Sequence, residues 1–201
     1  MIKVIALSFI LFVFLNANAQ VQFGAKAGAN YSSVKGIGST DKSRIGVYGG
    51  LMTNINLTKK IFVRPEILYS SKGERFPSTS FNSKGTIRYN YISAPILFGF
   101  SPNENISVMA GPEFNFLVNV NSIFDESNHD LTKNFEKVDL AIDAGAAYKI
   151  NHYLSAEVRY SHGFEGLTEV EYTDNMGNTL RRGKAGAHRV FQLGMTYRFG
   201  K

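Results

Sequence analysis

The segment from His188 to Phe199 alternates between large apolar residues and polar or small ones. Its odd positions from Phe191 onward are apolar, and its even positions include Gln192 and Arg198. Successive side chains of a β-strand point to opposite faces, so a strand with one apolar and one polar face is predicted. In a soluble barrel the apolar face points inward, whereas in a membrane barrel it points outward to lipid.

Eight segments of this kind, each bounded by turn residues, occur along the chain. Each has about 12 to 15 residues, enough for a tilted strand to cross a bilayer. Almost nothing in the sequence is typical of a helix. The predicted strands are approximately 21–32, 44–57, 61–72, 86–100, 105–119, 136–150, 153–164 and 187–199.

The connections between these strands alternate in length. Those at 57–60, 101–104 and 151–152 are tight, whereas those at 32–43, 73–85, 121–135 and 165–186 are long. An outer-membrane barrel has short periplasmic turns and longer external loops, which produces this order when the N-terminus starts in the periplasm. The expected fold class is therefore all-β, an eight-stranded up-and-down antiparallel transmembrane β-barrel.

Charged residues occupy the polar parity of the predicted strands. If the apolar face meets lipid, these charges share one narrow interior and must neutralise each other, because an unpaired buried charge costs several kcal/mol. Five bases and five acids permit this pairing. The predicted interior charge network comprises Lys26, Arg44, Arg64, Glu66, Glu113, Asp139, Asp143, Glu157, Arg159 and Arg198.

Aromatic residues near the strand ends predict two girdles at the levels of the lipid headgroups. The outer girdle is expected to contain Tyr31, Tyr69, Tyr89, Tyr91 and Tyr160, and the periplasmic girdle Tyr148, Tyr153, Tyr197 and Phe199.

Two irregularities are expected in the wall. The strand at 86–100 has mixed parity, which predicts a bulge or parity slip near Ser93. Pro65, Pro95 and Pro112 lie on adjacent strands and have no N–H to donate, so one locally irregular patch is expected there.

The N-terminus has the features of a secretory signal peptide. Lys3 precedes an apolar run from Val4 to Leu15, and an A-x-A pattern ends at Ala19, so residues 1–19 are predicted to be removed and 20–201 to form the barrel domain. The chain has no cysteine, which excludes disulfides and a lipoprotein anchor. The formal net charge of +6 is spread along the chain, which gives nucleic-acid binding little support.

Six phrases along the predicted strands share a common pattern: F-G-A-K-A-G-A-N-Y-S (23–32), R-P-E-I-L-Y-S-S-K-G (64–73), Y-I-S-A-P-I-L-F-G-F (91–100), A-G-P-E-F (110–114), L-S-A-E-V-R-Y (154–160) and F-Q-L-G-M-T-Y-R-F (191–199). They resemble the PorT-like outer-membrane β-barrel family of Bacteroidetes-type bacteria. The resemblance covers nearly all of the mature chain and implies an eight-stranded barrel in the outer membrane, without an assigned activity. One departure is that Gly200 and Lys201 follow Phe199, whereas many such barrels end on an aromatic residue.

No catalytic, cofactor or metal site is predicted. The acidic loop at 125–130 lacks the spacing and glycine of a calcium loop. Ser161, His162 and Glu165 are the residue types of a hydrolytic triad, but adjacent strand residues point to opposite faces.

The expected function is therefore a non-enzymatic binding or structural role, through the long external loops or as an accessory of an envelope or secretion complex. The expected surroundings are outer-membrane lipid and envelope proteins, with no nucleic acid, and the protein is expected to be a monomer. Two alternatives remain open: a soluble, lipocalin-like periplasmic binder with an apolar cavity, and an outer-membrane lipid-modifying enzyme.

Overall fold

The strands predicted from alternation are present at nearly the predicted bounds. A computed structural model describes residues 20–35, 42–76, 85–124, 127–164, 166, 168–173 and 179–200. The predicted signal peptide at 1–19 lies outside these residues. The long strands are β1 (Gln20–Lys35), β2 (Lys42–Asn56), β3 (Ile61–Phe76), β4 (Gly85–Phe100), β5 (Ile106–Phe124), β7 (Val138–Lys149), β8 (Leu154–Gly163) and β11 (Ala187–Arg198).

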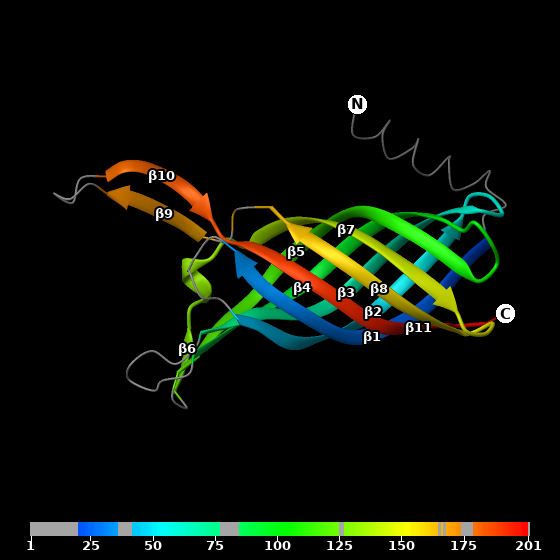
Figure 1. Cartoon of the computed structure of the whole chain (residues 1–201), viewed down its shortest axis with the longest axis horizontal. Coiled ribbons are helices and arrows are strands. Elements are labelled where there is room, and N and C mark those ends of the chain that lie inside the picture. The colour runs from blue at the N-terminus through cyan, green and yellow to red at the C-terminus, as the bar shows by residue number, and fades with distance from the viewer. Residues whose placement is uncertain are drawn as a thin grey trace, which may run out of the picture.

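These eight strands close into an antiparallel barrel (Figure 1). Neighbours follow the order β4, β3, β2, β1, β11, β8, β7 and β5, and pairing between β4 and β5 closes the ring. The seam joins the first and last strands, with Gly24 opposite Arg198 and Lys35 opposite Ala187. The predicted fold class is confirmed.

The two ends of the barrel differ in the way the sequence predicts. Tight turns at 57–60, 101–105 and 150–153 cluster at one end, on the right in Figure 1. The opposite end carries β6 (Ser127–Asp130), the 3-10 helix η1 (Thr132–Asn134) and a separate hairpin of β9 (Thr168–Thr173) and β10 (Thr179–Ala185). These four elements were predicted as loop. No helix within the described residues is both long enough and apolar enough to span a membrane.

The barrel is apolar outside and polar inside. Leu193, Val158 and Ile142 are 57%, 41% and 51% exposed, whereas Arg159 and Glu157 are 1% and 2% exposed. A soluble barrel would show the reverse, because burying a charge and exposing apolar surface to water are both unfavourable. The sheet is therefore inverted relative to a lipocalin, which argues against the alternative of a soluble binder with an apolar cavity.

Most of the predicted girdle residues lie on the outer surface. Tyr31, Tyr69 and Tyr160 are exposed, as are Tyr148, Tyr153, Tyr197 and Phe199 at the tight-turn end. Tyr89 and Tyr91 were predicted wrongly, because both side chains are buried inside the barrel. The exposed Ile92, Ile96 and Phe98 fix the opposite parity of β4, so the two tyrosines must face inward.

The predicted parity slip is on β5 rather than near Ser93. Where β4 passes Asn90, β5 has one extra residue, Val118, and the register shifts. This bulge moves the inward parity of β5 so that Val120 is fully buried beyond it. Ser93 itself is buried and pairs regularly with Asn115.

The three strand prolines do produce a locally irregular patch of wall. Beside each of Pro65, Pro95 and Pro112 the residue pairing is interrupted and then resumes in the same register. The interruptions need no bulge, since each proline only removes a donor from the ladder. The unpaired residues are 53–54 and 64–65 between β2 and β3, 66–67 and 94–95 between β3 and β4, and 96–97 and 111–112 between β4 and β5.

Candidate functional site

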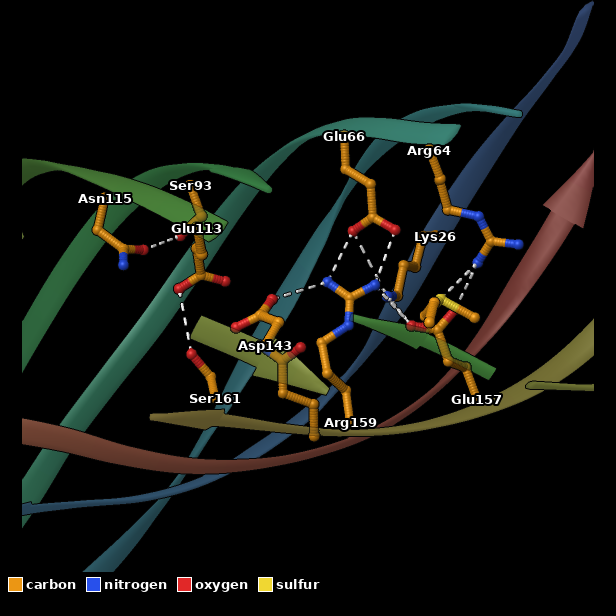
Figure 2. A network of polar contacts seen from close by, with 12 residues as sticks. Lys26, Arg64, Glu66, Ser93, Glu113, Asn115, Asp143, Glu157, Arg159 and Ser161 are labelled. Atoms are coloured by element: carbon orange, nitrogen blue, oxygen red, sulfur yellow. Dashed lines mark hydrogen bonds and ion pairs between the residues drawn. The ribbon is translucent and has the colours of Figure 1, made fainter. Parts of the chain in front are cut away.

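The middle of the barrel is filled by an ion network around Arg159 on β8 (Figure 2). Its guanidinium binds both carboxylate oxygens of Glu66 on β3, at 2.8 and 2.9 Å. The same group donates to Glu157 at 2.7 Å and to Asp143 at 3.3 Å. Bidentate geometry makes the Glu66 pair the strongest of these contacts, and it ties opposite walls of the barrel together.

Glu157 extends this network toward the tight-turn end. It binds the ammonium of Lys26 on β1 and accepts a hydrogen bond from Arg64 on β3 at 3.0 Å. The Nε–H of Arg64 donates to Asn54 at 2.6 Å, and Lys26 also lies 3.5 Å from Glu66. Glu157, Lys26, Arg64 and Asn54 thus link strands β8, β1, β3 and β2 across the interior.

A second ion pair lies further toward the loop end. Lys72 on β3 donates to Glu113 on β5 at 2.7 Å and to Asn115 at 2.9 Å. Ser161 donates to Glu113 at 3.5 Å, and Ser93 donates to Asn115 (Figure 2). All these side chains are buried, so the interior cross-section is occupied by paired polar groups.

Seven of the ten predicted network residues take part in these ion pairs, and Lys72 is an eighth that the sequence analysis missed. Four cations face four anions. Lys72 shares the inward parity of Arg64 and Glu66 on the same strand, so the signal was present in the sequence. The seven predicted members are Lys26, Arg64, Glu66, Glu113, Asp143, Glu157 and Arg159.

The other three predicted residues lie away from these pairs. Arg44 is buried nearer the loop end, where its guanidinium donates to the Ser71 hydroxyl at 3.2 Å and to the Lys72 carbonyl at 3.1 Å. Asp139 is buried, and one of its carboxylate oxygens has no hydrogen-bond partner among the described residues. Arg198 lies at the tight-turn mouth, 3.4 Å from the carbonyl of Asn151.

An aromatic layer closes the interior near the loop end. The hydroxyl of Tyr91 lies 3.2 Å from Nε2 of His188. The rings of Tyr89 and Tyr91 both pack edge-on against the imidazole of His188. Phe135, which follows η1, packs edge-on against Tyr89 with ring centroids 5.2 Å apart. The buried apolar residues of this layer are Val34, Tyr89, Tyr91 and Val120.

The tight-turn end is open instead. A polar cavity of about 750 Å³ reaches from the turns into the barrel as far as Phe62 and Arg64. Phe62 belongs to a buried apolar cluster with Leu97, Met109 and Ala147. The interior therefore consists of an open vestibule, an apolar floor, a neutralised ion network and an aromatic layer.

The residue types of the hydrolytic triad are not assembled. Ser161 is buried inside the barrel, whereas His162 is only partly buried and lies beside the ring of Tyr160, which faces outward. Glu165 lies outside the described residues. Ser161 and His162 point to opposite faces, as predicted from their adjacent positions on a strand.

No group of three metal-ligating side chains occurs within the described part of the chain. Asp125 and Glu126 of the acidic loop lie outside it. Asp130 instead accepts hydrogen bonds from the backbone N–H and the hydroxyl of Thr132, and these bonds lower the pKa of its carboxyl group. This carboxylate organises a turn.

The polar interior and apolar exterior are the arrangement of a membrane barrel. Residues 16–169 match the family model for the outer membrane protein beta-barrel domain. The chain belongs to this family. It is a small outer-membrane β-barrel protein. In such barrels the short turns generally face the periplasm and the longer loops face the cell exterior.

Solved structures show the same fold. The chain is similar to Ail, the attachment invasion locus protein of Yersinia pestis in complex with the heparin analogue sucrose octasulfate, with a TM-score of 0.53, 17% identity, and coverage of 89% of this chain and 99% of that chain. Neisserial surface protein A gives a TM-score of 0.56 at 11% identity, covering 88% of this chain and 97% of that chain. No curated protein matches the sequence significantly.

Proposed function

We propose that this outer-membrane barrel protein is a non-enzymatic binding module whose partners contact the elements at its outer end. The observation that carries the proposal is the filled interior. Arg159 and its partners occupy the cross-section of the barrel, and their side chains are at most 1% exposed. A barrel whose interior is filled by fixed, paired charges is a rigid scaffold in the membrane. Specific binding is therefore expected in the segments that extend beyond the barrel.

The interior also argues against a pore. Eight strands leave room for little more than side chains. Here the ion network spans the barrel from β3 to β8, and the aromatic layer lies between this network and the loop end. Passage of a solute would require breaking buried ion pairs, which is costly.

The site chemistry supports a non-enzymatic role. Ser161 donates to Glu113 inside the barrel, whereas His162 is on the outer face. A nucleophile and its base must lie within hydrogen-bond reach of each other. The eight long strands leave no open edge in the barrel wall, so the wall offers no backbone template for pairing with another copy, which supports a monomer in outer-membrane lipid.

The finer family assignment is also a proposal. The phrases at 64–73, 91–100 and 154–160 resemble the PorT-like barrels, and this resemblance supports a second candidate function, that of an accessory in an envelope complex acting through the periplasmic turns. A vestibule that opens at those turns favours this candidate.

Single-cysteine variants test both candidates, because the chain has no cysteine of its own. Lys133→Cys places a thiol on η1 at the outer end, and Lys60→Cys places one in a periplasmic turn; both lysines are exposed. A membrane-impermeant maleimide should label only the first in intact cells and both after permeabilisation. Labelling of Lys60→Cys in intact cells would contradict the orientation.

The same variants distinguish the two modes of binding. A thiol-directed photo-cross-linker at position 133 should give specific adducts if the outer end binds partners, whereas adducts at position 60 alone would favour the accessory role. The purified wild-type barrel should show no steady conductance in planar bilayers and no lipid hydrolysis. Conductance, or hydrolysis that is lost in His162→Ala, would contradict the proposal.

A further inference from the structure

The periplasmic vestibule has a strong excess of positive charge. Five cationic side chains line it, and the only acidic side chain among its described lining residues is Glu104. The cations are Lys59, Lys60, Arg64, Lys149 and Arg198. A cleft lined by one sign of charge raises the local concentration of ions of the opposite sign.

Two buried polar groups in the wall of the vestibule lack protein partners among the described residues. The hydroxyl of Thr196 and the Nε–H of Arg198 are buried, and neither has a hydrogen-bond partner among the described residues. Thr196 is 3% exposed and lines the cavity. Buried polar groups are normally hydrogen-bonded. Two buried donors without partners at a cavity wall therefore indicate a ligand that supplies hydrogen-bond acceptors.

The two arginines of the vestibule differ in how far their guanidinium groups are already paired within the protein. Arg64 is already engaged by Glu157 and Asn54. Arg198 makes only a long contact, 3.4 Å to the carbonyl of Asn151, so its guanidinium retains donors for a further acceptor. A guanidinium matches a carboxylate in a bidentate geometry.

Side-chain amides complete the lining. Gln22, Asn54 and Asn56 reach the vestibule from β1 and β2, and Asn103 and Asn105 reach it from the turn between β4 and β5. The side-chain oxygens of Asn54 and Asn103 already accept hydrogen bonds, from Arg64 and from backbone N–H groups of the turn, so these two amides present their NH₂ groups as donors to a ligand. A volume of about 750 Å³ is in the range of pockets that enclose a small ligand, so it admits only a short segment of chain.

We propose that this vestibule is a periplasmic binding site for the carboxylate groups of a short acidic peptide segment, with Arg198 as the main anchor and Thr196 as an additional donor. The floor formed by Phe62 and Ala147 limits how far the segment enters. The site is separate from the outer-end function proposed above and shares with it only the orientation of the barrel.

A titration of the full-length mature barrel, refolded in zwitterionic detergent, tests this proposal. The probe is a pentapeptide of alternating aspartate and glycine, and the reference is the same peptide with asparagine for aspartate. We expect calorimetry to show saturable binding of the aspartate peptide that weakens as salt is raised, because exposed charges are screened. Arg198→Gln should weaken binding by about tenfold or more, the scale of one lost charged contact.

Lys133→Gln is the matched control, since it removes an exposed cation at the other end of the barrel and should leave the affinity unchanged. If Arg198→Gln fails to fold by circular dichroism, Lys149→Gln at the end of β7 replaces it, with a weaker but measurable effect. Equal binding of the two peptides, or equal affinities in the Arg198 and Lys133 variants, would overturn the proposal.

Inorganic phosphate separates a peptide site from a general anion site. Phosphate at the peptide concentration should displace little of the bound peptide, because it engages the cations without the amides. Full displacement would show a small-anion site and overturn the peptide assignment. The titration is done in detergent, so its result does not depend on the cell-labelling experiment that tests the orientation.

Discussion

Replacing Arg159 by glutamine tests whether the interior network holds the barrel together. The guanidinium makes four contacts with three carboxylates, at 2.7 to 3.3 Å. Glutamine keeps part of the side-chain stem and removes the charge. Glu157 would then keep Lys26 and Arg64, and Glu66 would keep only Lys26 at 3.5 Å, whereas Asp143 would lose its ion-pair partner.

The expected loss of stability is large. The Glu66 side chain is fully buried, and each of its carboxylate oxygens accepts a hydrogen bond from the Arg159 guanidinium, at 2.8 and 2.9 Å. Removing one partner of a buried ion pair costs about 3 to 5 kcal/mol, because the remaining charge is left uncompensated. We therefore expect Arg159→Gln to lower the free energy of unfolding by about 3 to 5 kcal/mol, with Arg159→Gln/Glu66→Gln recovering part of the loss.

The free energy of unfolding is measured by refolding the barrel into phospholipid vesicles and titrating with guanidinium chloride. The chain has no tryptophan, so far-ultraviolet circular dichroism and the gel shift between folded and boiled protein report the transition. Lys35→Gln, at the exposed end of β1, is the control for loss of one positive charge. A loss below about 1 kcal/mol in Arg159→Gln, comparable to an exposed pair, would refute the reasoning.

Three further predictions concern other parts of the barrel. A Cβ at Gly99 would overlap the ring of Phe62, so Gly99→Ala should destabilise by about 1 to 3 kcal/mol, and by less when combined with Phe62→Leu. Leu193→Arg puts a charge in the exposed apolar belt and should cost about 2 to 4 kcal/mol in vesicles. The carboxyl of Asp130 has a lowered pKa through its bonds from Thr132, so its stabilisation of the turn is present above the ordinary aspartate pKa and lost as pH falls through the lower folded value.

Each of these predictions has its own control. Additive losses for Gly99→Ala and Phe62→Leu in a double-mutant cycle would contradict the ring contact. Ile106→Arg, at the periplasmic start of β5, should cost about 0 to 1 kcal/mol, and equal costs at both positions would contradict a lipid-facing belt centred near Leu193. The amide resonance of Thr132 in nuclear magnetic resonance should shift with acid only in the wild type, not in Asp130→Asn.

The barrel architecture was predictable because its physical signal is repeated along the whole chain. Each long strand keeps one face apolar to match the bilayer, so alternation is clear in seven of the eight strands, and the seven connections alternate in length. The same signal places Arg159, Glu157 and Glu66 inside. It fails for the outer elements, because β9 and β10 extend beyond the barrel and have no apolar belt to maintain.

The wrong predictions share a cause. Tyr89 and Tyr91 were assigned to the outer girdle because aromatic residues are common there, yet the interior near the loop end is itself apolar and accepts them. Where both faces of a strand are apolar, alternation no longer distinguishes them. The slip predicted near Ser93 followed from the same assignment, because outward-facing Tyr89 and Tyr91 would require a change of parity before Ile92. The bulge lies at Val118 on β5 instead.

The seam between β1 and β11 determines how this chain can fold. Asn30 bonds to Gln192, 162 positions away, so the ring closes only after the last strand has been synthesised. A chain that ends before residue 187 would present two open edges inside the membrane, where unpaired backbone groups are costly. Because the ends of β1 and β11 are adjacent, a circularly permuted chain joined there and opened at a periplasmic turn should form the same ring.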